Sequence, residues 1–171
     1  MGRKSIKENK NIYQIAREEQ NLTRAQASEK LVFISEAKIE KIESEAAKPQ
    51  PEDVVAMSKA YLRPDLCNYY CANECPIGQK NVAPVNYKDL SLSNITLEVL
   101  SSLNFLNNNK DRLVDITVDG KISEAELHDF AGIYKELTDI SNTAQALKIW
   151  IEQQANENRI DLNALNEHLS K

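Results

Sequence analysis

Apolar residues recur at helical spacing in a series of short segments separated by polar residues and prolines. A first helix is predicted over residues 12–20, in which four residues have the spacing of a core-facing stripe: Ile12, Ile15, Ala16 and Glu19. Another helix is predicted over residues 52–62, and a third opens at Pro64 and must end at Pro76. Residues 11–75 are therefore expected to form four or five short helices in one compact unit.

The segment from residue 22 to residue 43 contains two helix starts separated by a short turn. Thr23 can cap a helix through its hydroxyl, and Gln26 can return the bond. Ser35 offers a second cap. Apolar residues follow each cap on one helical face: Ala27 and Leu31, then Ile39 and Ile42. Two short helices joined by a tight turn form the unit that places a helix against a DNA major groove.

The second half of the chain predicts longer helices. Residues 77–89 contain Gly78 and Pro84 and are expected to be a linker. In residues 92–117 the apolar positions fall on two sides, which predicts a helix with more than one neighbour, bent or broken at residues 107–109. Three further stripes follow: Leu127, Phe130, Tyr134 and Leu137; Ala144, Leu147, Ile151 and Gln154; Leu162, Leu165 and Leu169. We therefore predict an all-α protein with domains at residues 1–76 and 90–171, the second an antiparallel helical bundle.

Composition and charge agree with this class and restrict the partners. Four Gly and five Pro among 171 residues argue against a sheet protein. Residues 1–63 carry 12 Lys and Arg against 10 Asp and Glu, whereas the remaining residues carry 9 against 16. A polyanionic partner is therefore expected only for the N-terminal third. Within it, residues 1–10 hold four basic residues, which form either a frayed terminus or an arm that reaches phosphates: Arg3, Lys4, Lys7 and Lys10.

The same features predict a cytoplasmic protein. The charged N-terminus does not resemble a secretory signal. The least polar long run, residues 90–106, contains Glu98 and several Ser and Asn, so we expect no membrane span. An odd total of three cysteines argues against a disulfide framework and favours a reducing compartment.

The three cysteines, Cys67, Cys71 and Cys75, are spaced by four and would line one face of a helix. On a straight helix the outer two are about 12 Å apart, so one zinc ion binds all three only if Pro76 unwinds the helix end. Two interpretations stay open. The thiols are small packing groups between the two domains, or they form a metal or redox sensor.

Other candidate chemistry is weaker. Residues 115–126 match a calcium loop at some positions, but a plain turn between helices, with Gly120 and Ser123 as caps, explains them better. His128 and His168 are isolated on expected surface faces. No nucleophile–base pair or glycine-rich phosphate loop is found, so we expect neither an enzyme nor a cofactor.

Residues 11–63 resemble the Xre family of regulators, whose helices are of the phage Cro and repressor type. The matching residues are Leu22-Thr23, Leu31 and Ile39-Glu40-Lys41-Ile42-Glu43, followed by a Pro and a further amphipathic helix. The resemblance implies a lambda-repressor-like five-helix domain that docks the helix beginning at Ser35 in the major groove. The family usually has a Gly at the turn after the second helix, where this chain has Val32.

The resemblance implies a DNA-binding transcriptional regulator, which we expect to form a homodimer or to bind a protein partner through the bundle. Arg24 would meet a phosphate, and the implied DNA-binding residues are Thr23, Arg24, Ser35, Glu36, Ala37, Lys38 and Lys41. Glu36 and Glu40 beside the two lysines leave this face almost without net charge. A second hypothesis is therefore a protein-interaction adaptor that keeps the fold without binding DNA.

Overall fold

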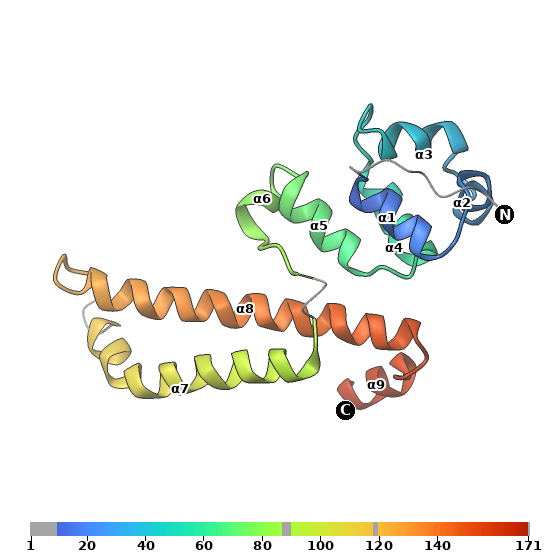
Figure 1. The fold of residues 1–171 in the computed structure, drawn as a ribbon. Coiled ribbons are helices and arrows are strands. Elements are labelled where there is room, and N and C mark those ends of the chain that lie inside the picture. The colour runs from blue at the N-terminus through green and yellow to red at the C-terminus, as the bar shows by residue number, and fades with distance from the viewer. Residues whose placement is uncertain (1–9, 87–89, 118–119, 171) are drawn as a thin grey trace. The chain divides into compact units, whose positions relative to one another are not determined.

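The computed structural model describes residues 10–86, 90–117 and 120–170 (Figure 1). These residues form helices and no strands, which confirms the all-α class. The helices are α1 (Ile12–Glu19), α2 (Arg24–Leu31), α3 (Glu36–Glu43), α4 (Pro51–Ala60), α5 (Asp65–Asn73), α6 (Gly78–Asn81), α7 (Leu92–Thr117), α8 (Leu127–Asn156) and α9 (Leu162–Leu169).

The contacts divide the chain into two compact units. One comprises the residues up to Pro84 together with those from Glu152 onward, and the other is Val85–Ile151. The first unit thus holds α1–α6 and α9, and the second holds α7 and most of α8. Part of the predicted linker, residues 77–89, is helical, because α6 packs against α5. The predicted division at residues 76 and 90 otherwise stays a prediction.

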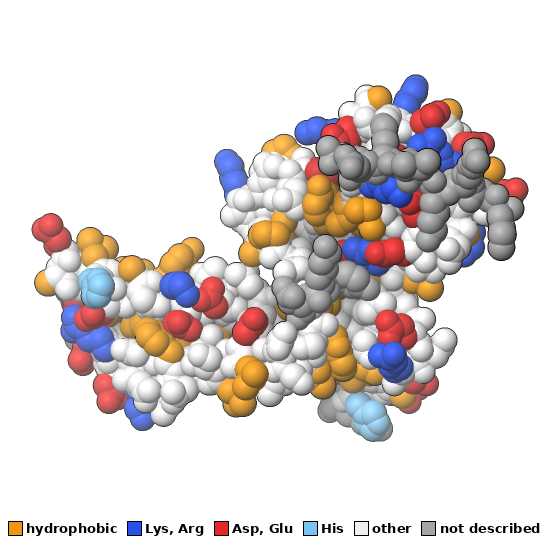
Figure 2. All heavy atoms as spheres, viewed as in Figure 1, with side chains coloured by type: hydrophobic (Ala, Val, Ile, Leu, Met, Phe, Trp, Pro, Cys, Tyr) orange, Lys and Arg blue, Asp and Glu red, His pale blue; other side chains and the backbone are white. Residues whose placement is uncertain are grey.

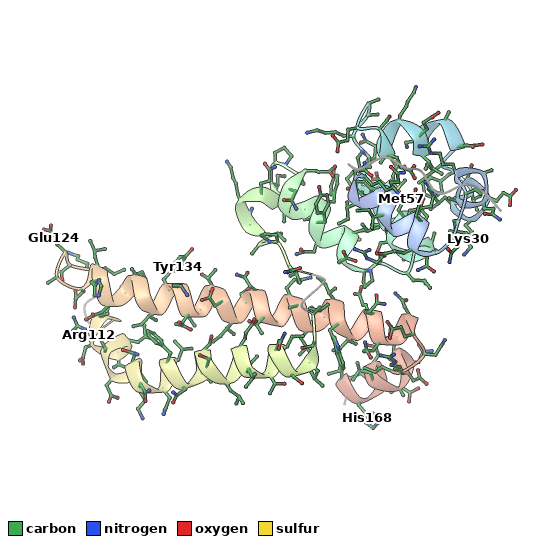
Figure 3. All side chains as sticks on the ribbon, viewed as in Figure 1. Lys30, Met57, Arg112, Glu124, Tyr134 and His168 are labelled. Atoms are coloured by element: carbon green, nitrogen blue, oxygen red, sulfur yellow. The ribbon has the colours of Figure 1, made fainter. Side chains whose placement is uncertain are left out.

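The core of the first unit is built by α1–α5. Eleven apolar side chains are buried in it: Tyr13, Ala16, Ala27, Leu31, Ile34, Ile39, Ile42, Val54, Met57, Tyr61 and Leu66. Figure 3 shows Met57 enclosed by these helices and Lys30 at their outer edge. Since each helix is short, its stability depends on the apolar face that it buries here rather than on its own propensity.

The buried face of α1 differs from the one predicted. Ile15 is 40% exposed and Glu19 is exposed, so the prediction that they face the core is wrong. Tyr13 and Arg17 are buried instead. The structure shows why, because a carboxylate from α3 neutralises the Arg17 side chain inside the unit.

Prolines and one glycine set the junctions between α4, α5 and α6. Pro51 stands at the start of α4, and α5 lies between Pro64 and Pro76 as predicted. Gly78 opens α6 against α5 so closely that a Cβ there would lie 2.1 Å from the Cys71 carbonyl oxygen. Only glycine, which has no Cβ, allows the backbone of α6 to lie this close to the backbone of α5.

Helices α7 and α8 form an antiparallel hairpin within the second unit (Figure 1). The hydroxyl of Thr143 donates to the Glu98 carboxylate at 3.3 Å, and Arg112 Nε lies 2.6 Å from Asp129 Oδ2. Residue numbers therefore increase along α7 while the numbers of their partners on α8 decrease, which shows that the two helices are antiparallel. Helix α7 is unbroken through residues 107–109, where the sequence predicted a bend or a break, and α8 is one helix of 30 residues where the sequence suggested two stripes.

The last predicted helix is confirmed as α9, which Asp161 caps by accepting bonds from the backbone N–H groups of Asn163 and Ala164. In the described part of the chain, no helix combines the length and the apolar character that crossing a bilayer requires.

Candidate nucleic-acid interface

Two side-chain caps fix the starts of α2 and α3, as predicted. Thr23 Oγ1 accepts from the Gln26 backbone N–H at 3.2 Å, and Gln26 Oε1 accepts from the Thr23 N–H at 2.9 Å. Ser35 Oγ accepts from the Lys38 N–H at 3.3 Å. Each bond satisfies a donor that the first turn of a helix leaves without an intrahelical partner. Thr23 and Ser35 therefore position the two helices, since their hydroxyls are engaged in capping.

The turn between α2 and α3 is sharp. Val32 has φ 59° and ψ −50°, and the Phe33 N–H donates to the Leu31 carbonyl at 2.6 Å across it. This is a three-residue turn in a strained backbone region. The Ser28 hydroxyl donates to the Ile34 carbonyl at 2.9 Å, and the Ile34 side chain is buried. The side chains of Val32 and Phe33, by contrast, are 87% and 63% exposed.

The inner side of α3 is held by a buried carboxylate. Glu43, whose side chain is 1% exposed, accepts from Arg17 of α1 at 2.5 and 2.9 Å. It also accepts from Nε of Arg24 of α2 at 2.9 Å. One carboxylate therefore ties three helices together, and Arg24 is directed toward α3 rather than outward. Burial lowers the pKa of Arg17, but the bonds to Glu43 outweigh it and the net pKa is raised.

A second ion pair involves the predicted contact residue Lys38. Its Nζ lies 2.7 Å from Oδ1 of Asp53, whose side chain is 3% exposed. The other oxygen of Asp53 accepts from the Gln50 N–H at 2.9 Å and so caps α4. Lys38 thus joins α3 to α4, and the structure places its ammonium group against a carboxylate.

The outer side of α3 is exposed at four positions: Glu36, Ala37, Glu40 and Lys41. Glu40 accepts from Arg24 Nη1 at 3.1 Å, a surface pair. The Lys41 side chain has no ion-pair partner among the residues that the structure describes. Figure 2 shows charges of both signs intermixed over this part of the molecule.

The structure thus separates the seven predicted DNA-binding residues into two groups. Thr23, Ser35, Arg24 and Lys38 are engaged by partners within the unit, and Glu36, Ala37 and Lys41 face outward. The sequence prediction missed the carboxylates that bind the two cations. The sequence did contain a signal for these buried carboxylates. Glu43 follows Ile39 by four residues, and Asp53 precedes Met57 by four, so each acid lies on the apolar face of its helix.

An apolar hollow lies beside the turn. It has a volume of about 500 Å³ and is lined by Phe33, Pro51, Glu52, Val55, Ala56 and Lys59. Its presence follows from the exposure of Phe33 in the turn and of Val55, which is 46% exposed on α4.

The other candidate groups do not converge in the described residues. Cys67 and Cys71 lie on α5, whereas Cys75 lies beyond its end and accepts from the Gly78 N–H at 3.4 Å. Burial raises the pKa of Cys67, although a bond with Ser58 opposes it. In the described chain, no group of three His, Cys, Asp or Glu residues has the geometry for a metal ion.

Two predictions fall partly outside the described residues. The basic segment 1–10 is described only from Lys10, which pairs with Glu18 at 2.7 Å. The calcium-loop match at residues 115–126 includes residues 118–119, which lie outside the described part. Its last acid, Glu126, is bonded to the Ser123 hydroxyl and N–H, and Gly120 has φ 69°.

Comparison of the chain with protein-family models, with curated proteins and with solved structures gives no match.

Proposed function

We propose that the chain is a DNA-binding regulator of the Xre type, with α2 and α3 as a helix-turn-helix in a lambda-repressor-like domain. The observation that carries the proposal is the division of α3 into two sides. Ile39, Ile42 and Glu43 anchor its inner side, and its outer side is exposed among the described residues of the unit. A rigidly held helix with one free face is what insertion into a major groove requires.

Within this proposal Lys41 is the main contact to the phosphate backbone, and Ala37 lies against base edges. Arg24 and Lys38 reach phosphates only by leaving Glu43 and Asp53, so their contribution is reduced. Since phosphate contacts supply most of the affinity for DNA, we expect weak binding by each copy. Two copies on adjacent half-sites would compensate for this weakness.

A second function, a protein-interaction adaptor, is favoured by one specific observation. Val32 and Phe33 expose apolar side chains beside an apolar hollow on the same surface where the cations are paired. Exposed apolar groups around a hollow suit a protein ligand better than a phosphate backbone.

A selection from random-sequence DNA duplexes at low salt, followed by shift assays, tests the proposal. We expect a shared motif to be enriched and Lys41→Glu to weaken binding to it by about tenfold or more, because a phosphate contact becomes a repulsion. The matched control is Lys80→Glu, the same charge change at an exposed position of α6. It should leave binding nearly unchanged.

Two results would contradict DNA binding through α3. One is the absence of any shift at low salt, which would favour the adaptor. The other is equal weakening by Lys41→Glu and Lys80→Glu, which would show that only the overall charge matters.

A further inference from the structure

The buried carboxylate of Glu43 is shared unequally by two arginines. Arg17 binds it through Nε and Nη2 at 2.5 and 2.9 Å, and the Arg17 side chain is 7% exposed. Arg24 binds it through Nε alone at 2.9 Å, and the Arg24 side chain is 32% exposed. Glu43 therefore keeps a bidentate cation partner if Arg24 turns away. Departure of Arg24 leaves no unpaired charge inside the unit.

The second ion pair of Arg24 already lies at the surface. Its Nη1 donates to Glu40 at 3.1 Å, and the Glu40 side chain is exposed. Loss of this pair costs little, because water solvates both groups. Lys38 differs, since its partner Asp53 is buried and has no second cation within ion-pair distance among the described residues. Of these two cations, Arg24 is the one that can leave without stranding a buried charge.

Tyr61 has an unused donor near the same carboxylate. It is the C-cap residue of α4, and its side chain is fully buried in the core of the first unit. Its hydroxyl has no hydrogen-bond partner in the part of the chain that the structure describes. Burial raises the pKa of Tyr61, the charge of Glu43 raises it further, and the charge of Arg17 lowers it. The hydroxyl is therefore close enough to the Arg17–Glu43 pair to interact with both charges.

The bonds of Glu43 show what Arg24 leaves behind. Oε2 of Glu43 accepts from Arg17 Nη2 and from Arg24 Nε, so both lone pairs of this oxygen are engaged. Departure of Arg24 frees one of them. A buried acceptor and a buried hydroxyl that each lack a partner destabilise the fold, whereas a bond between the two satisfies both.

We propose that Tyr61 is a reserve donor for Glu43. When Arg24 turns outward to a DNA phosphate, the Tyr61 hydroxyl donates to the carboxylate in its place; we call this the reserve bond. The exchange replaces one bond to a buried charge by another. Tyr61 is thus a positioning residue, because it is buried away from DNA and acts through Arg24. The inference rests on the proposed function and adds to it the means by which a paired cation becomes available to DNA.

Urea unfolding of the full chain, without DNA, tests the reserve bond. Arg24→Met imitates the departed arginine, because it keeps an aliphatic stem and cannot donate a hydrogen bond. In the wild type, Tyr61→Phe should leave the folding equilibrium constant of the first unit unchanged or raise it, since an unpartnered hydroxyl is removed. In Arg24→Met, the same substitution should lower that constant about tenfold, since there the hydroxyl donates to Glu43.

Tyr13→Phe is the matched control. It removes the hydroxyl of another buried tyrosine of the same core, which donates to Glu74 at 2.9 Å. Since this bond does not involve Arg24, Tyr13→Phe should lower the folding constant by about the same factor in both backgrounds. Far-UV circular dichroism checks that each variant keeps its helices. Arg24→Ala repeats the comparison if Arg24→Met does not fold.

DNA binding at several salt concentrations tests the exchange itself. With the duplex enriched by the selection described above, Tyr61→Phe should reduce the slope of the logarithm of the binding constant against the logarithm of salt concentration by about one. The reason is that Arg24 stays with Glu43 and one phosphate contact is lost. Tyr13→Phe should leave the slope unchanged. A merely structural role of Tyr61 would change stability without changing the number of phosphates bound.

Two results would overturn the inference even in a protein that binds DNA. One is an equal effect of Tyr61→Phe on the folding constant in the wild type and in Arg24→Met. The other is an unchanged salt slope in Tyr61→Phe. Absence of DNA binding beside a background-dependent effect of Tyr61→Phe is a different outcome. It would contradict the proposed function, and with it the exchange, while the reserve bond itself stands.

Discussion

Glu43 is the residue on which the position of α3 depends most. Its carboxylate accepts bonds from Arg17 and Arg24 in a buried setting. A buried ion pair contributes little relative to an apolar core, but removal of one partner leaves the other charge unpaired. Two arginines share this carboxylate, which makes the loss larger.

We therefore expect Glu43→Gln to lower the free energy of unfolding of the first unit by about 3–5 kcal/mol. Urea unfolding followed by far-UV circular dichroism measures this change. Glu29→Gln is the control, because Glu29 is an exposed acid on α2, and it should cost less than about 0.5 kcal/mol. A small effect at Glu43 would show that the arginines are solvated instead.

Residue-level prediction succeeded where the interaction is local. The caps at Thr23 and Ser35 depend on residues three positions away, so the sequence contains all the needed information. It missed the ion pairs of Arg17 and Lys38, whose partners are 26 and 15 residues distant along the chain. Spacing along one helix does not indicate which neighbour supplies a counter-charge.

At the scale of elements, the turn between α2 and α3 stores strain. Val32 is β-branched and has a positive φ, a conformation that glycine adopts without steric cost. Its side chain is almost fully exposed, so little packing opposes a change.

Val32→Gly should therefore stabilise the first unit by about 1 kcal/mol, the strain relieved less the added freedom of the unfolded chain. Chemical denaturation of the variant beside the wild type measures the difference. Val32→Ala keeps a Cβ and should gain much less. Destabilisation by glycine would mean that the valine side chain makes contacts that outweigh the strain.

The sequence predicted most helices because their apolar stripes and their caps or prolines coincide. It divided α8 wrongly, since residues 127–137 and 144–154 were treated as separate stripes. The two stripes belong to one helix, and the residues between them, 138–143, contain no proline or glycine that would end it.

At the scale of the whole molecule, the stability of the second unit should depend on protein concentration if it pairs. Trp150, the single tryptophan, lies on α8 in this unit and is half-buried. Its fluorescence therefore reports on the hairpin. We expect the apparent unfolding free energy to rise by about 1.4 kcal/mol for each tenfold increase in concentration, by mass action.

The same titration with Leu103→Glu is the control, because it puts a charge on a half-exposed leucine of α7, and it should give a midpoint that does not move. A concentration-independent midpoint in the wild type would indicate that the hairpin unfolds as part of a monomer. Composition and charge predicted the helical class of the molecule, but they carry no information on pairing, because that depends on which apolar positions remain uncovered after folding.

The shared carboxylate of Glu43 has a kinetic consequence for the first three helices. Since Arg17 of α1 and Arg24 of α2 both bond to the carboxylate of α3, detachment of α3 removes the shared partner of both arginines, and detachment of α1 or α2 breaks a bond to it. Fraying of a single segment is thereby suppressed, and amide hydrogens in all three should exchange with solvent through one common opening event.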